Sequence, residues 1–160
     1  MTVKIEEKPS QQVLTTFALG PYPQSAPKAW KELNDWLRKN APTLDGQRIG
    51  FGMDNPLMTP HHLLRYIAGI TIKDVTENTG KDQIYPLTLP GGKFAKHTVT
   101  GPYKQIPDAI NHVMNEWMQK SEFQFDITRP ILEHYVNDPN KVPEDEYQTD
   151  ILVPVMAKDA

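Results

Sequence analysis

Blocks of apolar and polar residues along the first half of the chain predict a strand, a helix and two further strands. The run from Val13 to Leu19 is β-branched and apolar and ends at a Gly-Pro pair, which is typical of a strand. From Ser25 to Lys39 the apolar residues recur along one stripe at helical spacing. Ile49 to Met53 predicts a short strand closed by an Asp-Asn-Pro turn, and Leu64 to Ile72 predicts another.

The second half of the chain repeats this order of elements. Ile84 to Leu89 predicts a strand, which we expect to pair through a Pro-Gly-Gly turn with a second strand from Lys93 to Val99. Gln105 to Gln119 carries a clear apolar stripe and predicts a helix. Closing strands are predicted at Ile131 to Val136 and at Asp150 to Val155.

The two halves are copies of one unit. Gly20-Pro21-Tyr22 recurs as Gly101-Pro102-Tyr103 at an offset of 81, and Asp54-Asn55-Pro56 faces Asn137-Asp138-Pro139 at an offset of 83. We expect Val3 to Glu7 to be a strand and the counterpart of the one before the Pro-Gly-Gly turn. Each unit is then β-β-α-β-β in outline.

This pattern predicts an α+β fold of duplicated β-α-β-β units related by a pseudo-two-fold axis. We expect one twisted, mainly antiparallel sheet with two helices on one face and a ligand pocket at the seam between the copies. Residues 1–160 form one domain in this interpretation, with repeats of about 1–80 and 81–160. A polar loop is expected from Thr76 to Asp82.

Composition narrows the classes of function. A net charge of −3 and the lack of a basic cluster argue against a protein that grips a phosphate backbone. No apolar run approaches the ~20 residues of a membrane span, and the first residues are too polar for a signal peptide. The absence of cysteine rules out disulfides and thiolate zinc sites. Residence in the cytoplasm is the simplest expectation.

The most informative difference between the copies is an acidic residue. Aligned on the Asp/Asn-Pro turns, Glu133 stands opposite Gly50 and Tyr135 stands opposite Gly52. Glu133 lies inside an apolar strand, where a carboxylate is expensive to bury without a partner. Two interpretations remain open on this evidence: a glutamate facing solvent on a half-exposed strand, or an anchor for an organic cation in a partly apolar pocket.

The chain resembles the GyrI-like family, also known as the effector-binding domain of AraC-type regulators. Two Gly-Pro-Tyr segments each lead into a helix that carries a tryptophan. Asp54-Asn55-Pro56 and Leu64-Arg65-Tyr66 fit the first half of the family pattern. Leu132-Glu133-His134-Tyr135 and the stretch from Thr149 to Val155 fit the second half. The resemblance extends from about Val3 to Met156.

The resemblance implies a bacterial small-molecule sensor or sequestering protein of the multidrug-binding kind. Several members bind lipophilic cations through a deep glutamate, which by motif position is Glu133 here. Because this chain carries no recognisable DNA-binding segment, we expect no direct contact with nucleic acid, and regulation would need a separate protein partner. No contact with a membrane is expected either. Asp150 stands where the family pattern leads us to expect Glu, so no role is carried over to it.

Aromatic and thioether side chains would complete such a site through cation–π contact and apolar burial. The candidates beside Glu133 are Tyr135, Tyr66, Phe51, Met53, Tyr147, Trp117 and Trp36. Trp36 and Trp117 also lie on the apolar helix stripes, which favours packing in the core. Loss of hydration should raise the pKa of the Glu133 carboxyl group.

Two other classes of function stay open. A hydrolase of electrophilic small molecules could use Glu133 as general base together with Tyr135. A protein-interaction module of the gyrase-inhibitor type would need an exposed apolar patch. Adjacent His61 and His62 in a loop do not by themselves make a metal site, and neither a metal nor a cofactor is expected.

Overall fold

The computed structural model describes residues 1–73 and 83–159, so the expected loop from Thr76 to Asp82 lies outside the described residues. The chain folds into two compact units. The first-repeat unit is Gln11–Leu89, and the second-repeat unit combines Met1–Ser10 with Pro90–Ala160. Both are α+β units in which a helix covers one face of an antiparallel sheet, as the sequence predicted.

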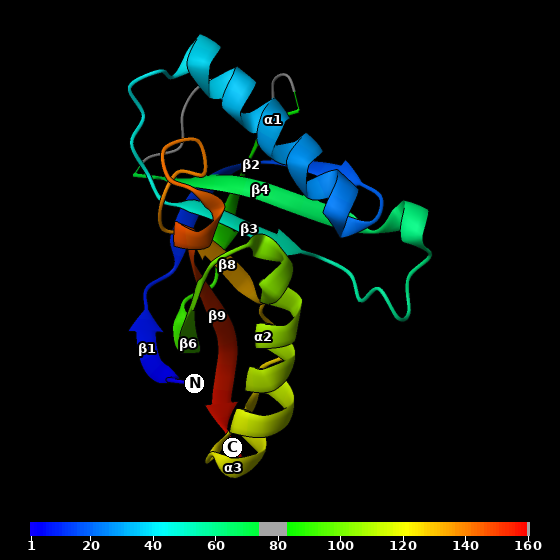
Figure 1. Ribbon diagram of the computed structural model, residues 1–160, viewed down its shortest axis with the longest axis vertical. Coiled ribbons are helices and arrows are strands. Elements are labelled where there is room, and N and C mark those ends of the chain that lie inside the picture. Colours follow the sequence, from blue (N-terminus) through cyan, green and yellow to red (C-terminus); the bar gives the residue numbers. More distant parts are fainter. Residues whose placement is uncertain (74–82, 160) are drawn as a thin grey trace. The chain divides into compact units, whose positions relative to one another are not determined.

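The first-repeat unit has the strand order β3-β4-β2-β5. Its strands are β2 (Gln11–Leu19), β3 (Arg48–Gly52), β4 (Arg65–Ile72) and β5 (Tyr85–Leu89), and every pairing is antiparallel. Helix α1 (Tyr22–Asn40) runs along β4 and β2 (Figure 1). The expected helix therefore exists and starts three residues earlier, at the Gly-Pro segment, where a proline in the first turn is tolerated because its missing N–H has no helical partner.

The core of the first-repeat unit lies between α1 and the sheet. Strand residues of one parity face the helix, because side chains alternate across a strand. The buried members are Leu14, Ala18, Ala29, Leu33, Trp36, Leu37, Tyr66, Ala68, Ile70 and Ile84. The apolar stripe read from the sequence of the helix is the stripe that packs here.

The second-repeat unit has the strand order β1-β6-β9-β8. These strands are β1 (Lys4–Lys8), β6 (Gly92–Thr100), β8 (Leu132–Tyr135) and β9 (Gln148–Ala157). A three-residue strand, β7 (Phe123–Phe125), pairs with the end of β9 and was not predicted. Turns of 3-10 helix occupy His61–Leu63, Tyr103–Gln105 and Glu144–Glu146.

The second helix is interrupted. It consists of α2 (Ile106–His112), a π-helical segment (Val113–Trp117) and α3 (Met118–Lys120). Its apolar stripe meets β6 and β9 in a core of Ala95, Val99, Ile106, Ala109, Val113, Met118, Ile151, Val153 and Val155. The sequence predicted the helix but not the change of helical pitch.

The predicted hairpin between β5 and β6 is wrong. Strand β5 pairs with β2, and β6 pairs with β1 and β9. The repeats exchange their first strands: β1 precedes the first-repeat unit in sequence but completes the sheet of the second. The segment that follows β5 runs close beside the segment that follows β1, since a Cβ at Gly91 would lie 2.5 Å from the carbonyl oxygen of Lys8 and the nitrogen of Ser10.

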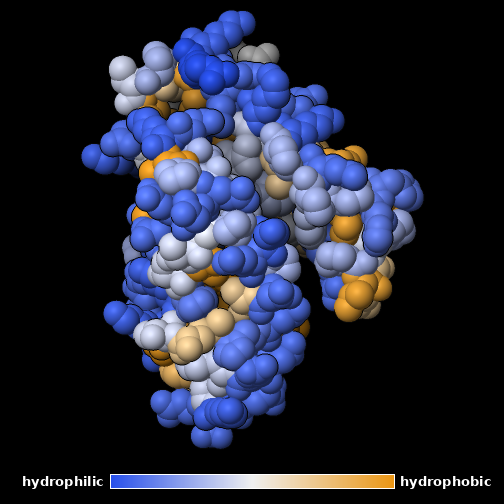
Figure 2. Space-filling view, viewed as in Figure 1, coloured by the Kyte–Doolittle hydropathy of each residue, from blue (hydrophilic) through white to orange (hydrophobic). Residues whose placement is uncertain are grey.

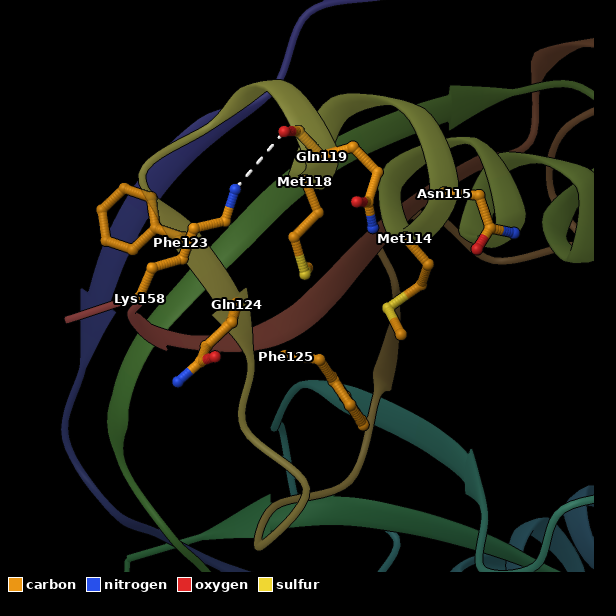
Figure 3. A pocket seen from close by; sticks show the side chains of 8 residues that line it. All are labelled: Met114, Asn115, Met118, Gln119, Phe123, Gln124, Phe125 and Lys158. Carbon is orange, nitrogen blue, oxygen red and sulfur yellow. Dashed lines mark hydrogen bonds between the residues drawn. The ribbon is translucent and has the colours of Figure 1, made fainter. Parts of the chain in front are cut away.

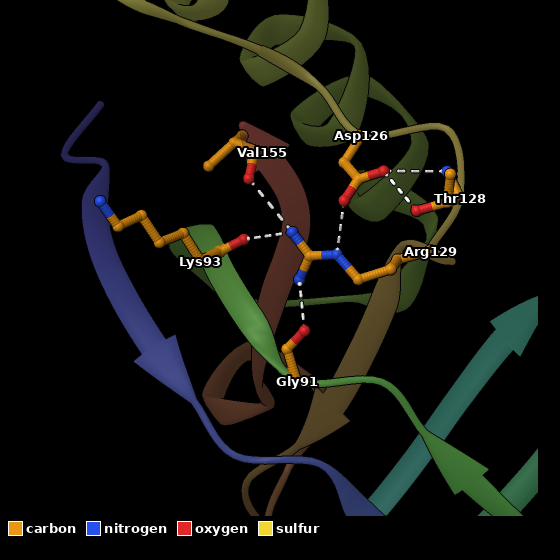
Figure 4. A network of polar contacts seen from close by, with 6 residues as sticks. All are labelled: Gly91, Lys93, Asp126, Thr128, Arg129 and Val155. Atoms are coloured by element: carbon orange, nitrogen blue, oxygen red, sulfur yellow. Dashed lines mark hydrogen bonds and ion pairs between the residues drawn. The ribbon is translucent and has the colours of Figure 1, made fainter. Parts of the chain in front are cut away.

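A buried arginine ties the segment at Gly91 to the rest of the second-repeat unit (Figure 4). Arg129 donates to the carbonyl oxygens of Gly91, Lys93 and Val155, and to Asp126 at 2.8 Å. Hydrogen bonds from the Thr128 hydroxyl group, the Arg129 guanidinium group and the Thr128 backbone amide lower the pKa of Asp126 to about 2. The guanidinium group also lies 4.7 Å from the centre of the Phe94 ring.

No helix in the described part of the chain is both long and apolar enough to cross a membrane.

Candidate functional site

Glu133 lies on β8, opposite Ile151 of the core strand β9. Its neighbours of the same parity, Ile131 and Tyr135, pack against the core beneath α2, so the glutamate points to the helix-covered face of its sheet. Tyr135 donates a hydrogen bond from Oη to Glu133 Oε1 at 3.2 Å. The prediction that Glu133 and Tyr135 share a strand face is confirmed.

The electrostatic state of Glu133 follows from its surroundings. The residue is half-buried, and loss of hydration raises the pKa of its carboxyl group to about 7 against the smaller opposing effect of the Tyr135 hydrogen bond. Among the described residues, no lysine, arginine or histidine lies within ion-pair distance of this carboxylate. Because the pKa of Glu133 is near neutrality, its carboxyl group can change between the neutral and the ionised form at physiological pH.

Three tyrosine rings gather beside Glu133. Tyr103 meets the ring of Tyr135 edge-on with centroids 5.3 Å apart, and it stacks on Tyr147 at 4.7 Å. All three side chains are half-buried. Burial raises the pKa of Tyr103 to about 12, so its hydroxyl group stays protonated and its ring keeps the electron-rich face of a neutral phenol.

Tyr103 is not among the candidates named from the sequence, where it and Tyr22 are expected mainly to pack at the helix starts. In the first repeat the equivalent tyrosine, Tyr22, lies over Gly52, where a Cβ would come within 2.6 Å of its ring. The Tyr22 hydroxyl donates to the carbonyl oxygen of Asp54 at 2.6 Å and accepts from the Asp54 amide at 3.0 Å. The place of Gly52 is taken by Tyr135 in the second repeat, which leaves no room for the same position of Tyr103.

The candidates of the first-repeat unit divide between two faces of its sheet. Tyr66 is buried on the α1 side, where its hydroxyl accepts a hydrogen bond from Trp30 Nε1 at 3.0 Å. Trp36 belongs to the same core. Phe51 and Met53 alternate to the opposite face, and Phe51 is buried whereas Met53 is largely exposed. Whether any of these residues contacts a ligand stays a prediction.

Trp117 and Asp150 have structural neighbours of their own. Trp117 stacks on Phe123 at 6.4 Å and packs against the core of the second-repeat unit. Asp150 accepts a hydrogen bond from Thr98 at 2.6 Å and lies 3.5 Å from Lys96 and 3.8 Å from His134. That polar group occupies the strand face opposite to Glu133, so Asp150 is not part of the arrangement around the glutamate.

No group of three or more acidic, histidine or cysteine side chains that could hold a metal ion occurs in residues 1–73 and 83–159.

Comparison with known proteins identifies the family of this chain. The model of the GyrI-like small molecule binding domain matches residues 1–156. The chain belongs to the GyrI-like family. It is 28% identical over 145 residues to a DNA gyrase inhibitor of Serratia proteamaculans, an alignment that covers 86% of this chain and 88% of that protein. As a GyrI-like domain, it is a small-molecule-binding module by family.

Several solved structures share the fold. The EcmrR C-terminal domain superimposes with a TM-score of 0.80 at 18% identity, covering 98% of both chains. In the EcmrR–DNA complex the match covers 98% of this chain but spans only 57% of the EcmrR chain. SAV2435 bound to tetraphenylphosphonium matches with a TM-score of 0.64 at 14% identity and covers 98% of this chain and 94% of that one. A hydrolase from Listeria innocua matches at 0.67, with 15% identity and coverage of 96% and 91%.

Proposed function

We propose that this GyrI-like domain binds small amphipathic organic cations and that Glu133 is their electrostatic anchor. The observation that carries the proposal is the Glu133 carboxylate: it is half-buried, receives one hydrogen bond from Tyr135, and has no cationic partner among the described residues. A buried anion without a counter-ion is unfavourable, and a ligand that supplies the positive charge removes that penalty.

The tyrosines beside the carboxylate suit the rest of such a ligand. Tyr135, Tyr103 and Tyr147 present adjoining rings, each able to contribute roughly 0.5–2 kcal/mol of cation–π attraction when desolvated. Tyr66, Phe51, Met53, Trp36 and Trp117 remain proposed lining residues of lower priority. The complex of SAV2435 with a lipophilic cation, on the same fold, supports this class of ligand.

The proposal fixes the pH dependence of binding. A cation favours the ionised form of Glu133, whose pKa without ligand is about 7. Below that pH the proton must leave before the cation binds, so affinity should fall roughly tenfold per pH unit. At pH 6 binding should release close to one proton, and at pH 8 nearly none.

Calorimetric titration with tetraphenylphosphonium at pH 6 and pH 8, in buffers of different ionisation enthalpy, tests this directly. Triphenylphosphine oxide, a neutral compound of similar shape, serves as the comparison ligand. Glu133→Gln should lose cation binding at both pH values, whereas Glu144→Gln, which removes an exposed carboxylate of the same unit, should bind as wild type does. Cation affinity that is equal in wild type and Glu133→Gln would reject the anchor.

A second candidate function has its own observation. The loop between β3 and β4 exposes Leu57 at 94% and Met58 at 83%, and apolar side chains gather at its tip (Figure 2). Such exposure is typical of a protein-binding surface, and curated relatives are named DNA gyrase inhibitor. In a gyrase supercoiling assay the wild type should inhibit, and the double variant L57S/M58S should inhibit less. No inhibition by the wild type would exclude this function.

The catalytic alternative rests on the same glutamate. A pKa of about 7 is well placed for a general base, and Tyr135 is within hydrogen-bond distance. Turnover of an electrophilic ester that disappears in Glu133→Gln would establish hydrolysis. Binding of tetraphenylphosphonium without turnover of such esters would favour the sensor.

A further inference from the structure

A groove of about 260 Å³ opens on the second-repeat unit, on the helix beside β7 (Figure 3). Its apolar surface comes from Met114 and Met118 on the interrupted helix and from Phe123 and Phe125 on β7. The side chain of Met114 points toward Phe125 in this view. Glu133 and the tyrosines beside it do not line this groove.

The helix departs from α geometry at the residues that line the groove. Met114 and Asn115 lie inside the π-helical segment Val113–Trp117, and Met118 follows it directly. Single π turns inside α-helices occur frequently at functional sites, because the extra residue redirects side chains and costs stability. In the first repeat, by contrast, α1 is helical without such a segment over all its 19 residues.

The two repeats also differ in the side chains themselves. At the offset of 81, the counterparts of Met114 and Met118 are Leu33 and Leu37, which are buried in the core of their unit. Methionine is unbranched and polarisable, so it adapts to the shape of a guest and makes favourable contacts with aromatic ring edges. The second repeat therefore has adaptable side chains where the first has stiff ones.

The polar lining disfavours a cation and offers hydrogen bonds to a neutral ligand. Three primary amides, those of Asn115, Gln119 and Gln124, border the groove, and none of its lining residues is acidic. The one charged lining residue is Lys158, whose Nζ donates to the carbonyl oxygens of Gln119 at 3.3 Å and Ser121 at 2.6 Å. An organic cation would meet this ammonium group with no anion to balance it. Amides instead offer both donors and acceptors to the edge of a neutral ring.

We propose that this groove is a second binding site, for small uncharged planar aromatic compounds of one or two rings that carry a hydrogen-bonding edge. Its volume lies just below the ~300–1,000 Å³ usual for ligand pockets, which suits a compact ligand rather than a drug-sized one. Rings stack against Phe125 and the thioethers, and the ring edge bonds to the amides. The site is independent of the cation site at Glu133 and does not require it.

Methyl NMR of protein labelled at the methionine methyl groups tests the site with indole as probe and tetraphenylphosphonium as the cationic comparison. The methyl signals of Met114 and Met118 should shift saturably with indole, while those of Met1, Met53 and Met58 should not. Tetraphenylphosphonium should leave the signals of the two groove methionines in place. Uniform shifts of all methionines, or no saturable shift, would overturn the proposal.

Two variants locate the effect. Gln124→Trp places a bulky ring at the groove and should weaken indole binding at least tenfold, whereas Asn140→Trp, on an exposed loop of the same unit, should leave it unchanged. Met114→Leu, which introduces the residue of the first repeat, should weaken it several-fold and keeps the test valid if Gln124→Trp unfolds. Unaltered indole affinity in folded Gln124→Trp and Met114→Leu would refute the site.

Discussion

Gly52 and Tyr135 occupy the same register position in the two repeats. Gly52 pairs with Tyr66 across β3 and β4, and Tyr135 pairs with Thr149 across β8 and β9, at the same offset of 83. The tyrosine of the pair is therefore Tyr66, on β4, in the first repeat and Tyr135, on β8, in the second. This exchange leaves Tyr22 over a glycine and sends Tyr103 onto Tyr147.

Gly52→Ala should destabilise the protein by roughly 1–3 kcal/mol, the usual range for overpacking. The new Cβ would lie 2.6 Å from the ring of Tyr22, whose hydroxyl is held at both Asp54 backbone groups. Urea unfolding measures the loss. In the Tyr22→Ala background the same change should cost clearly less, because the clash is gone. Equal losses in both backgrounds would show that Tyr22 is not the obstacle.

Stability should fall as pH rises through neutrality because of Glu133. Its folded-state pKa of about 7 exceeds the unfolded value near 4.3, so the folded protein binds the extra proton between these values. The penalty is absent below pH 4 and complete above pH 7 or so, and amounts to roughly 3–4 kcal/mol. Glu133→Gln should therefore gain stability relative to wild type between pH 5 and pH 8. A constant difference in free energy of unfolding across that range would contradict the raised pKa.

Arg129→Met should lower the free energy of unfolding by about 3 kcal/mol or more. The substitution leaves the Asp126 carboxylate without its cationic partner and removes the donor to three carbonyl groups. Arg129→Lys should recover only part of the loss, because an ammonium group cannot reproduce the planar fork. Asp126 gives the pH signature: its lowered pKa stabilises the fold fully above pH 4, and this is lost as pH falls through about 2. Acid unfolding of wild type and Arg129→Met should differ in this window.

Gly91→Ala should be strongly destabilising for so small a substitution and should lower the free energy of unfolding by about 3 kcal/mol or more. Its Cβ would meet backbone atoms of Lys8, Pro9 and Ser10 within 2.6 Å, where the segments that follow β1 and β5 run side by side. Gly69→Ala is the matched control in the middle of β4, where the nearest atom is the Thr15 methyl group at 3.2 Å. Comparable unfolding free energies for the two variants would argue against this close backbone contact.

The sequence by itself determined the blocks of helix and strand, the duplication and the shared face of Glu133 and Tyr135. These depend on local periods of 3.6 and 2, which each segment carries in its own residues. The same period already places Phe51 and Met53 on the face opposite to Gly50 and Gly52.

Only the tertiary structure decided which strands pair. Strands β5 and β6 are separated by a turn that fits a hairpin, yet β5 pairs with β2 and β6 pairs with β1. The burial of apolar side chains between distant segments decides the pairing, and the local turn does not. The π-helical segment, the stacking of Tyr103 on Tyr147 and the network around Arg129 are likewise decided by packing between residues distant in sequence. The raised pKa of Glu133 belongs with them, since desolvation depends on every neighbour the fold assembles.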